Sequence, residues 1–237
     1  MSAAALAMVL STGVLSLPAV AVIGPVEVPG TADLWLAGMP DGSTASINDS
    51  APAQSPVLVT IGPQVVGFSF DAVGSTHHGP GILRDAEGLP DPFILSHAPG
   101  AENGISDVTA PVSALMGVFL DDDQPDGTPA PVALSFATEA ERDFLTLSPA
   151  LKQVFFIGDG RNSALDLQLF EVPAGASRLF LGTMDGYEWN NNAGSLSVTL
   201  YPVITDPPVV PEGSTVISVL VLAGLGGWCC VRRRGTA

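Results

Sequence analysis

The segment from Asp185 to Ser195 carries the side chains of this sequence that are best suited to bind a metal ion. Asp185 is followed by three consecutive asparagines at positions 190–192, which lead into the small residues Ala-Gly-Ser. Calcium takes about six to eight oxygen ligands, and the carboxylates, amides and carbonyls of a glycine-containing loop can supply several of them. The segment therefore predicts a calcium-binding loop. A polar hairpin turn is the alternative, because asparagine and glycine both tolerate the positive φ angles of tight turns.

A second group of carboxylates lies at Asp121, Asp122 and Asp123, with Asp126 close behind. Adjacent carboxylates repel one another, and a bound cation relieves that repulsion. The spacing is not that of an EF-hand loop, which alternates its ligands and ends on a glutamate. A solvated acidic loop is therefore the simpler interpretation of this segment.

The three histidines, His77, His78 and His97, offer little basis for catalysis. His97 with Asp85 or Asp91 and a nearby serine could form a hydrolase set. No nucleophile-elbow motif, with its exposed serine between glycines, accompanies that set. We therefore expect that the protein is not an enzyme.

Composition limits both the fold and the partners. The chain has 237 residues, with 26 glycines and 21 prolines, while charged residues make up only 14%. Frequent chain-breaking residues favour short strands joined by turns over long helices. The net charge is −16 and Lys152 is the single lysine. Nucleic acid is therefore not an expected partner, because its phosphates are bound mainly by lysine and arginine.

Several stretches alternate apolar and polar residues with a period of two, as half-buried strands do. These stretches lie at residues 66–70, 165–169 and 196–200. Short apolar runs between turn residues add candidate strands at 57–61, 115–120, 132–136, 154–157 and 179–181. A short helix is expected after Thr138, which fits a capping box with Glu141. Many short strands of this kind predict an all-β fold, a β-sandwich or jelly roll, for the outer domain at residues 22–203.

Both ends of the chain have the features of targeting segments. Residues 1–21 hold an apolar run that ends in Ala-Val-Ala, the small-x-small pattern of a signal-peptide cleavage site. Retention of this segment as a membrane anchor is the alternative. Residues 216–231 are apolar and uncharged, and Arg232, Arg233 and Arg234 follow them. This pattern predicts one C-terminal transmembrane helix with the basic tail, residues 232–237, in the cytoplasm.

The order of parts around that helix resembles the PEP-CTERM sorting tail of Gram-negative bacteria. Pro211 and Glu212 lie in a proline-containing linker, residues 204–215, and match the start of the tail, while Gly213 takes the place of its second proline. The apolar span and the three terminal arginines complete the layout. The resemblance implies membrane attachment, recognition by an exosortase-type sorting enzyme, and a location at the cell surface or in the extracellular matrix.

The last part of the outer domain resembles the galactose-binding lectins of the PA-I type, which are small jelly-roll β-sandwiches. The resemblance is carried by Arg-Leu-Phe-Leu-Gly-x-x-Asp at 178–185 and by Asn-Asn-Ala-Gly-Ser-Leu-Ser-Val at 191–198. In those lectins an aspartate, a threonine and a pair of asparagines hold a Ca²⁺ that contacts sugar hydroxyls. The resemblance therefore implies that Asp185, Asn191 and Asn192 bind Ca²⁺, whereas the threonine has no match here.

Two aromatic residues in the same loop are candidate ligand contacts. Tyr187 and Trp189 each carry a ring that could stack on the apolar face of a sugar. Packing of Trp189 over the loop is the alternative.

Together, the targeting segments, the candidate calcium loop and its aromatic residues predict an exported, non-catalytic module that binds carbohydrate, with polysaccharide as a partner. A structural matrix protein without a ligand pocket is the alternative, and a secreted hydrolase is a weaker one.

Overall fold

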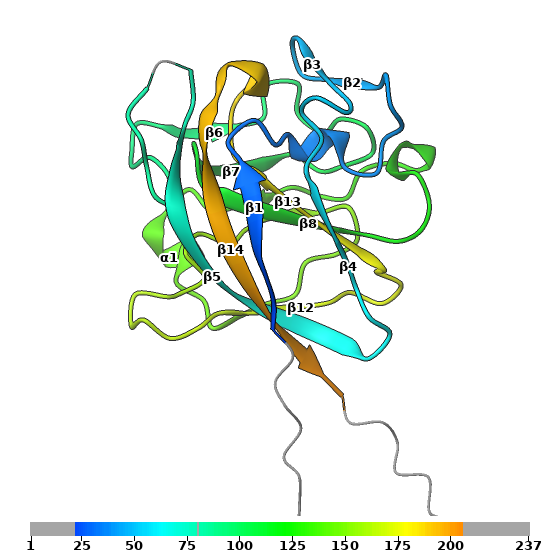
Figure 1. Ribbon diagram of the computed structural model, residues 1–237, viewed down its shortest axis with the longest axis vertical. Helices are drawn as coiled ribbons and strands as arrows, with labels where there is room; N and C mark the ends of the chain where they lie inside the picture. The colour runs from blue at the N-terminus through cyan, green and yellow to red at the C-terminus, as the bar shows by residue number, and fades with distance from the viewer. Residues whose placement is uncertain (1–21, 80, 206–237) are drawn as a thin grey trace, which may run out of the picture. The chain divides into compact units, whose positions relative to one another are not determined.

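The computed structural model describes residues 22–79 and 81–205, and these residues form an all-β fold with almost no helix (Figure 1). The predicted signal peptide, the sorting signal at Pro211 and Glu212, the apolar span and the terminal arginines lie outside the described residues. Within the described ranges, no helix has the length and apolar character needed to cross a membrane.

The larger sheet has five strands in the order β1-β14-β5-β12-β10. Its strands are β1 (Ile23–Pro29), β5 (Val65–His77), β10 (Thr146–Leu147), β12 (Leu169–Glu171) and β14 (Ala193–Ile204). β14 pairs antiparallel with β1 on one side and with β5 on the other. Leu196, Val198 and Leu200 are fully buried on one face of β14, as their alternation predicts.

The second large sheet has four strands in the order β11-β8-β13-β4. Its strands are β4 (Val57–Thr60), β8 (Leu115–Leu120), β11 (Val154–Phe156) and β13 (Arg178–Thr183). Aromatic rings join the two sheets: the centroids of Phe68 and Phe119 are 6.5 Å apart, and those of Phe155 and Phe170 are 5.4 Å apart. The two sheets therefore pack face to face around one core, and the fold is β-sandwich-like.

Smaller elements surround the sandwich. They are the pair β2 (Thr44–Ala45) and β3 (Asp49–Ser50), the sheet of β6 (Ile94–Ser96), β7 (Val108–Pro111) and β9 (Leu134–Ser135), the helix α1 (Glu139–Arg142), and the 3₁₀ helices η1 (Leu34–Leu36), η2 (Pro125–Gly127) and η3 (Trp189–Asn191). The capping box that predicts α1 is confirmed. The Glu141 N–H donates to Thr138 Oγ1 at 3.3 Å, and the Thr138 N–H donates to Glu141 Oε2 at 2.8 Å.

The predicted strand over residues 165–169 is wrong for most of its length. Leu165 has a φ of 68° and is 72% exposed, and β12 begins only at Leu169. Gln168 is fully buried instead, and its Nε2 donates to the carbonyls of Arg142 at 2.7 Å and Phe144 at 3.0 Å. The alternation is inverted because two backbone carbonyls accept from the Gln168 side-chain NH₂ group, while its Oε1 is buried without a hydrogen-bond partner.

β14 continues one residue past the predicted end of the domain. It ends at Ile204, and the Thr205 N–H donates to the Gln64 carbonyl at 3.0 Å. Pro202 fits within this strand because β1 pairs with β14 no further than Leu200. At position 202 the strand has a neighbour on one side only, so the N–H that proline lacks is not needed on the open side.

Residues 185–192 lie at the opposite end of the sandwich from the two ends of the described chain. In the β1–β14 register, Ile23 pairs with Leu200 and Pro29 pairs with Ser195. The chain therefore enters and leaves at the same end (Figure 1). The loop before β14 is separated from that end by the length of the strand, roughly 40 Å at ~3.3 Å per residue.

Candidate functional site

A cleft of about 590 Å³ lies where β5 and β13 end and β14 begins. Its lining residues come from segments that are distant in the sequence: His78, Gly79, Gly81, Pro92, Phe93, Leu95, Asp185, Tyr187, Glu188 and Asn191. Three of the five residues predicted to bind calcium or sugar, Asp185, Tyr187 and Asn191, therefore share one cleft.

Asp185 brings a nearly buried carboxylate to this cleft. The residue is 6% exposed, and its Oδ1 accepts a hydrogen bond from the Gly186 N–H at 2.6 Å. Burial raises the pKa of the Asp185 carboxyl, and its interactions with the Asn192 side chain and the Gly186 N–H oppose that rise. A carboxylate whose charge is poorly solvated is stabilised by a cation at the same place. The position of Asp185 is therefore suitable for a divalent metal.

Asn192 ties the loop before β14 to the segment after β5, and Asn191 lies close to the same segment. Asn192 is 8% exposed, and its Oδ1 accepts from the Gly79 N–H while its Nδ2 donates to the Gly30 carbonyl, both at 3.1 Å. Asn191 is exposed, and its Oδ1 lies 3.4 Å from where a Cβ on Gly79 would stand. Asn191 therefore presents its amide at the cleft, whereas both polar groups of the Asn192 side chain are bound to protein partners.

The two aromatic candidates have different surroundings. Tyr187 is 51% exposed at the cleft, so its ring is free to contact a ligand. Trp189 is fully buried, with its Nε1 donating to the Thr183 carbonyl at 2.9 Å and its ring centroid 5.4 Å from that of Trp35. Trp189 therefore packs beneath the loop, which is the alternative to sugar stacking.

Apolar side chains also line the cleft, and no motif in the sequence indicates them. Phe93 is 43% exposed and Leu95 is 40% exposed, and both line the cleft together with His78. The ring centroids of His78 and Phe93 are 5.9 Å apart. Apolar residues in an irregular segment carry no recognisable motif, so only the folded chain brings Phe93 and Leu95 into the same cleft as Asp185.

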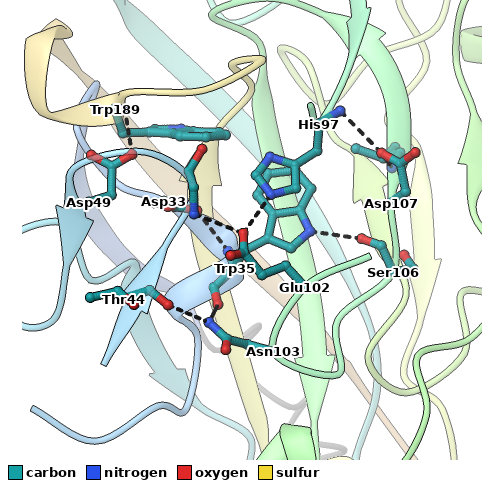
Figure 2. A network of polar contacts seen from close by, with 12 residues as sticks. Asp33, Trp35, Thr44, Asp49, His97, Glu102, Asn103, Ser106, Asp107 and Trp189 are labelled. Carbon is teal, nitrogen blue, oxygen red and sulfur yellow. Dashed lines mark hydrogen bonds and ion pairs between the residues drawn. The ribbon is translucent and has the colours of Figure 1, made fainter. Parts of the chain in front are cut away.

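A buried polar cluster supports the loop from below (Figure 2). The His97 ring stacks on Trp35 with centroids 3.7 Å apart and an interplanar angle of 12°, and its Nε2 lies 2.9 Å from Glu102 Oε2. Asp33 Oδ1 accepts from the Trp35 N–H at 2.9 Å and caps η1. His97 is thus paired with Glu102 within the interior. Among the described residues, the hydrogen-bond partner of the His97 ring is Glu102 rather than Asp85 or Asp91.

The buried carboxyl group of Asp33 makes the stability of the fold depend on pH. Burial raises the pKa of Asp33 well above its ordinary value of 3.8, and the negative charges of Asp49, Glu102 and Asp185 add to the rise. The folded protein therefore holds this proton more tightly than the unfolded chain does. The resulting stability is fully present below pH 3.8 and is lost as the pH rises through the folded-state pKa.

Asp33→Asn keeps the acceptor for the Trp35 N–H but carries no charge, so its stability does not suffer this loss. We expect the difference in thermal midpoint, variant minus wild type, to be larger at pH 7 than at pH 4. For a domain of this size each 1 kcal/mol corresponds to ~2–4 °C. Thermal unfolding followed by circular dichroism at both pH values measures the difference. If that difference in thermal midpoint is the same at pH 4 and pH 7, the prediction is wrong.

The acidic loop at Asp121, Asp122 and Asp123 is organised by protein groups. Arg178 donates from Nε to the Asp121 carbonyl at 2.6 Å and from Nη2 to the Asp123 carbonyl at 2.7 Å, and Ser177 Oγ donates to Asp122 Oδ1 at 2.6 Å. In the part of the chain that the structure describes, no three His, Cys, Asp or Glu residues are grouped to hold a metal ion. The cleft is a different kind of candidate, because amide oxygens are among its expected ligands.

No protein-family model matches the chain, and no curated protein sequence matches it either. The residues of the cleft and their surroundings are therefore the basis for assigning a function.

Proposed function

We propose that this protein is an exported, non-catalytic module that binds carbohydrate through Ca²⁺ in the cleft formed by Asp185, Tyr187 and Asn191. The observation that carries the proposal is that these three residues of one loop line a single cleft, to which two distant segments, around Gly79 and around Phe93, also contribute. The jelly-roll form of the β-sandwich belongs to the same proposal, since the resemblance to PA-I-type lectins implies both.

Each side of the cleft has a part in this proposal. The Asp185 carboxylate and the amide oxygens of Asn191 and Asn192 would hold Ca²⁺, and the ion would supply a positive centre to which sugar hydroxyls bind. The exposed rings of Tyr187 and Phe93 would contact the apolar face of the sugar. The polar side would thus orient the sugar, and the apolar side would add contact area.

The sorting tail is part of the same proposal. An anchored protein of this type would be held through the chain that follows Ile204, with the domain on the outer side of the membrane. Residues 185–192 lie at the other end of β14 from Ile204. An exported domain of this kind would meet polysaccharide at the cell surface or in the matrix.

A structural matrix protein remains the second candidate, and one observation favours it. Both groups of the Asn192 amide already bind protein partners, the Gly79 N–H and the Gly30 carbonyl. A loop closed by such bonds is complete without a metal. Calcium binding therefore decides between the two functions.

The test compares the full-length wild-type protein, purified in mild detergent, with Asp185→Asn and Asn191→Ala. If the wild type binds Ca²⁺, a concentration of 100 Kd adds ~2.7 kcal/mol of stability, which raises the thermal midpoint by about 5–10 °C. We expect both variants to lose most of that shift, because each loses a ligand oxygen. Differential scanning calorimetry with and without Ca²⁺ measures it. Asp126→Asn, an exposed change in the other acidic loop, should keep the full shift.

A glycan array then tests the ligand. Binding that requires Ca²⁺, disappears in chelator and is weakened by Tyr187→Ala supports the proposal. A wild-type protein with no calcium shift and no glycan bound in either condition would establish the structural role instead.

A further inference from the structure

The carboxylate of Asp49 is buried directly against the candidate loop, although the two segments are far apart in the sequence. Asp49 begins β3 and is 1% exposed. Its Oδ2 accepts from the Trp189 N–H at 2.9 Å, and its Oδ1 accepts from the Asn190 N–H at 2.8 Å. Figure 2 shows Asp49 next to Trp189. Both oxygens of one side chain therefore hold successive backbone groups of the loop.

These two N–H groups lie at the start of η3, where a helix needs an external acceptor. The residue that precedes η3, Glu188, makes no capping hydrogen bond with its side chain and has a φ of 62°. Asp49 thus supplies from another element the cap that Glu188 does not provide. The position of η3 is decisive for the site, because Asn191 is its last residue and Asn192 follows it.

Asn48 reinforces the same attachment. Its Nδ2 donates to Glu188 Oε1 at 2.9 Å, and its carbonyl accepts from Asn190 Nδ2 at 3.1 Å. Asn48 and Asp49 together bind three consecutive residues, Glu188 to Asn190. The β2–β3 hairpin is therefore fastened to the loop that carries the candidate metal ligands.

The charge of Asp49 also acts on the cleft. Burial raises the pKa of Asp49, the negative charges of Asp185 and Glu188 raise it further, and the N–H groups of Trp189 and Asn190 oppose the rise. Asp49 and Asp185 therefore repel each other. A cation beside Asp185 would reduce that repulsion, so the charge of Asp49 favours cation binding as well as holding the loop.

We propose that Asp49 is a positioning residue for the calcium loop: its carboxylate fixes η3 so that Asn191 and Asn192 face the metal together with Asp185. This inference rests on the proposed function, since it assigns Asp49 a part in the same site. Partners that orient metal ligands in this way typically change metal affinity ~10–100-fold when they are removed.

The test uses Asp49→Asn in the full-length protein in mild detergent, with Asp33→Asn as the matched control. Both variants neutralise a buried carboxylate that caps a 3₁₀ helix, but Asp33 caps η1 rather than η3. Isothermal titration with CaCl₂ should show Ca²⁺ affinity reduced at least ~10-fold in Asp49→Asn and clearly less in Asp33→Asn, which removes a negative charge near Asp185 but no contact with η3. Equal affinity in Asp49→Asn and the wild type would overturn the inference.

Hydrogen exchange of the metal-free protein gives an independent measurement. We expect the amides of Trp189 and Asn190 to lose protection in Asp49→Asn, while amides in the middle of β14 keep theirs. Unchanged protection of both loop amides refutes the positioning role, whatever the outcome for calcium. If instead the wild type binds no Ca²⁺ while the loop amides lose protection in the variant, the proposed function fails and the attachment of the loop stands.

A milder variant covers the case in which Asp49→Asn does not fold. Asn48→Gly removes the side-chain bond to Glu188 and keeps a residue suited to the φ of 68° at this position. It should weaken Ca²⁺ binding by several-fold and reduce protection of the same loop amides. No effect on either measurement would contradict the proposal.

Discussion

Replacing Gly160 by alanine is expected to destabilise the fold by ~3–5 kcal/mol, through backbone strain and overpacking together. Gly160 has a φ of 88°, and a Cβ added there would overlap the carbonyl oxygen of Phe70, a backbone atom of β5. The preceding residue, Asp159, accepts the Ala72 N–H with its carbonyl at 3.3 Å, so the turn is fixed along β5. Neither backbone can move without breaking this pairing. Urea unfolding followed by fluorescence measures the loss.

Gly42 provides a matched control, because its φ is also 88° and a Cβ added there would meet nothing within 4 Å. Gly42→Ala should therefore cost only the intrinsic penalty of a left-handed conformation, ~1–2 kcal/mol. The difference between the two variants isolates the overlap with β5. Equal losses of stability would show that the turn at Gly160 does not lie against Phe70.

Replacing Trp35 by alanine is the second change with a large expected effect, a loss of ~3–5 kcal/mol. Trp35 is fully buried, stacks on His97, and donates from Nε1 to the Ser106 carbonyl at 3.1 Å. Alanine leaves a cavity, an unpaired buried carbonyl, and a His97 ring without its stacking partner. Trp189 also loses a neighbour, so the loop that carries Asn191 should loosen. Urea unfolding at pH 7 gives the free energy.

Tyr187→Ala is the control for Trp35→Ala, since it removes a ring that is half exposed on the same side of the molecule. Its effect on stability should stay within ~0.5 kcal/mol, as for other surface substitutions. Under the proposed function, the same change should weaken glycan binding. A loss below ~1 kcal/mol for Trp35→Ala would mean that the stacked platform beneath the loop does not form.

Local pattern was sufficient to predict most of the strands that build the core. β8 follows the apolar run Leu115–Leu120, and β14 follows the alternation of Leu196, Val198 and Leu200. These strands obey the rule that the buried face is apolar. Residues 165–169 break the rule, because the side chain that turns inward is Gln168 and its acceptors come from another segment. No property of residues 165–169 alone reveals those acceptors.

Some residues of the candidate site could be named from the sequence, whereas others are evident only in the structure. Asp185, Asn191 and Asn192 could be named as candidates because they lie within one short loop, whose composition suggests an oxygen site and whose sequence resembles that of PA-I-type lectins. Phe93 and Asp49 could not, because a loop phenylalanine and a single aspartate carry no motif.

The sequence by itself therefore determined the all-β character, the main strands and a small set of polar candidates. Each of these depends on residue type and near-neighbour spacing. Only the tertiary structure decided that Trp189 is buried, that His97 pairs with Glu102, and that Asp49 holds the loop from the β2–β3 hairpin. The physical reason is that these contacts join residues far apart in the chain. These contacts form only when the two sheets and their loops pack around one core, so a local sequence pattern does not predict them.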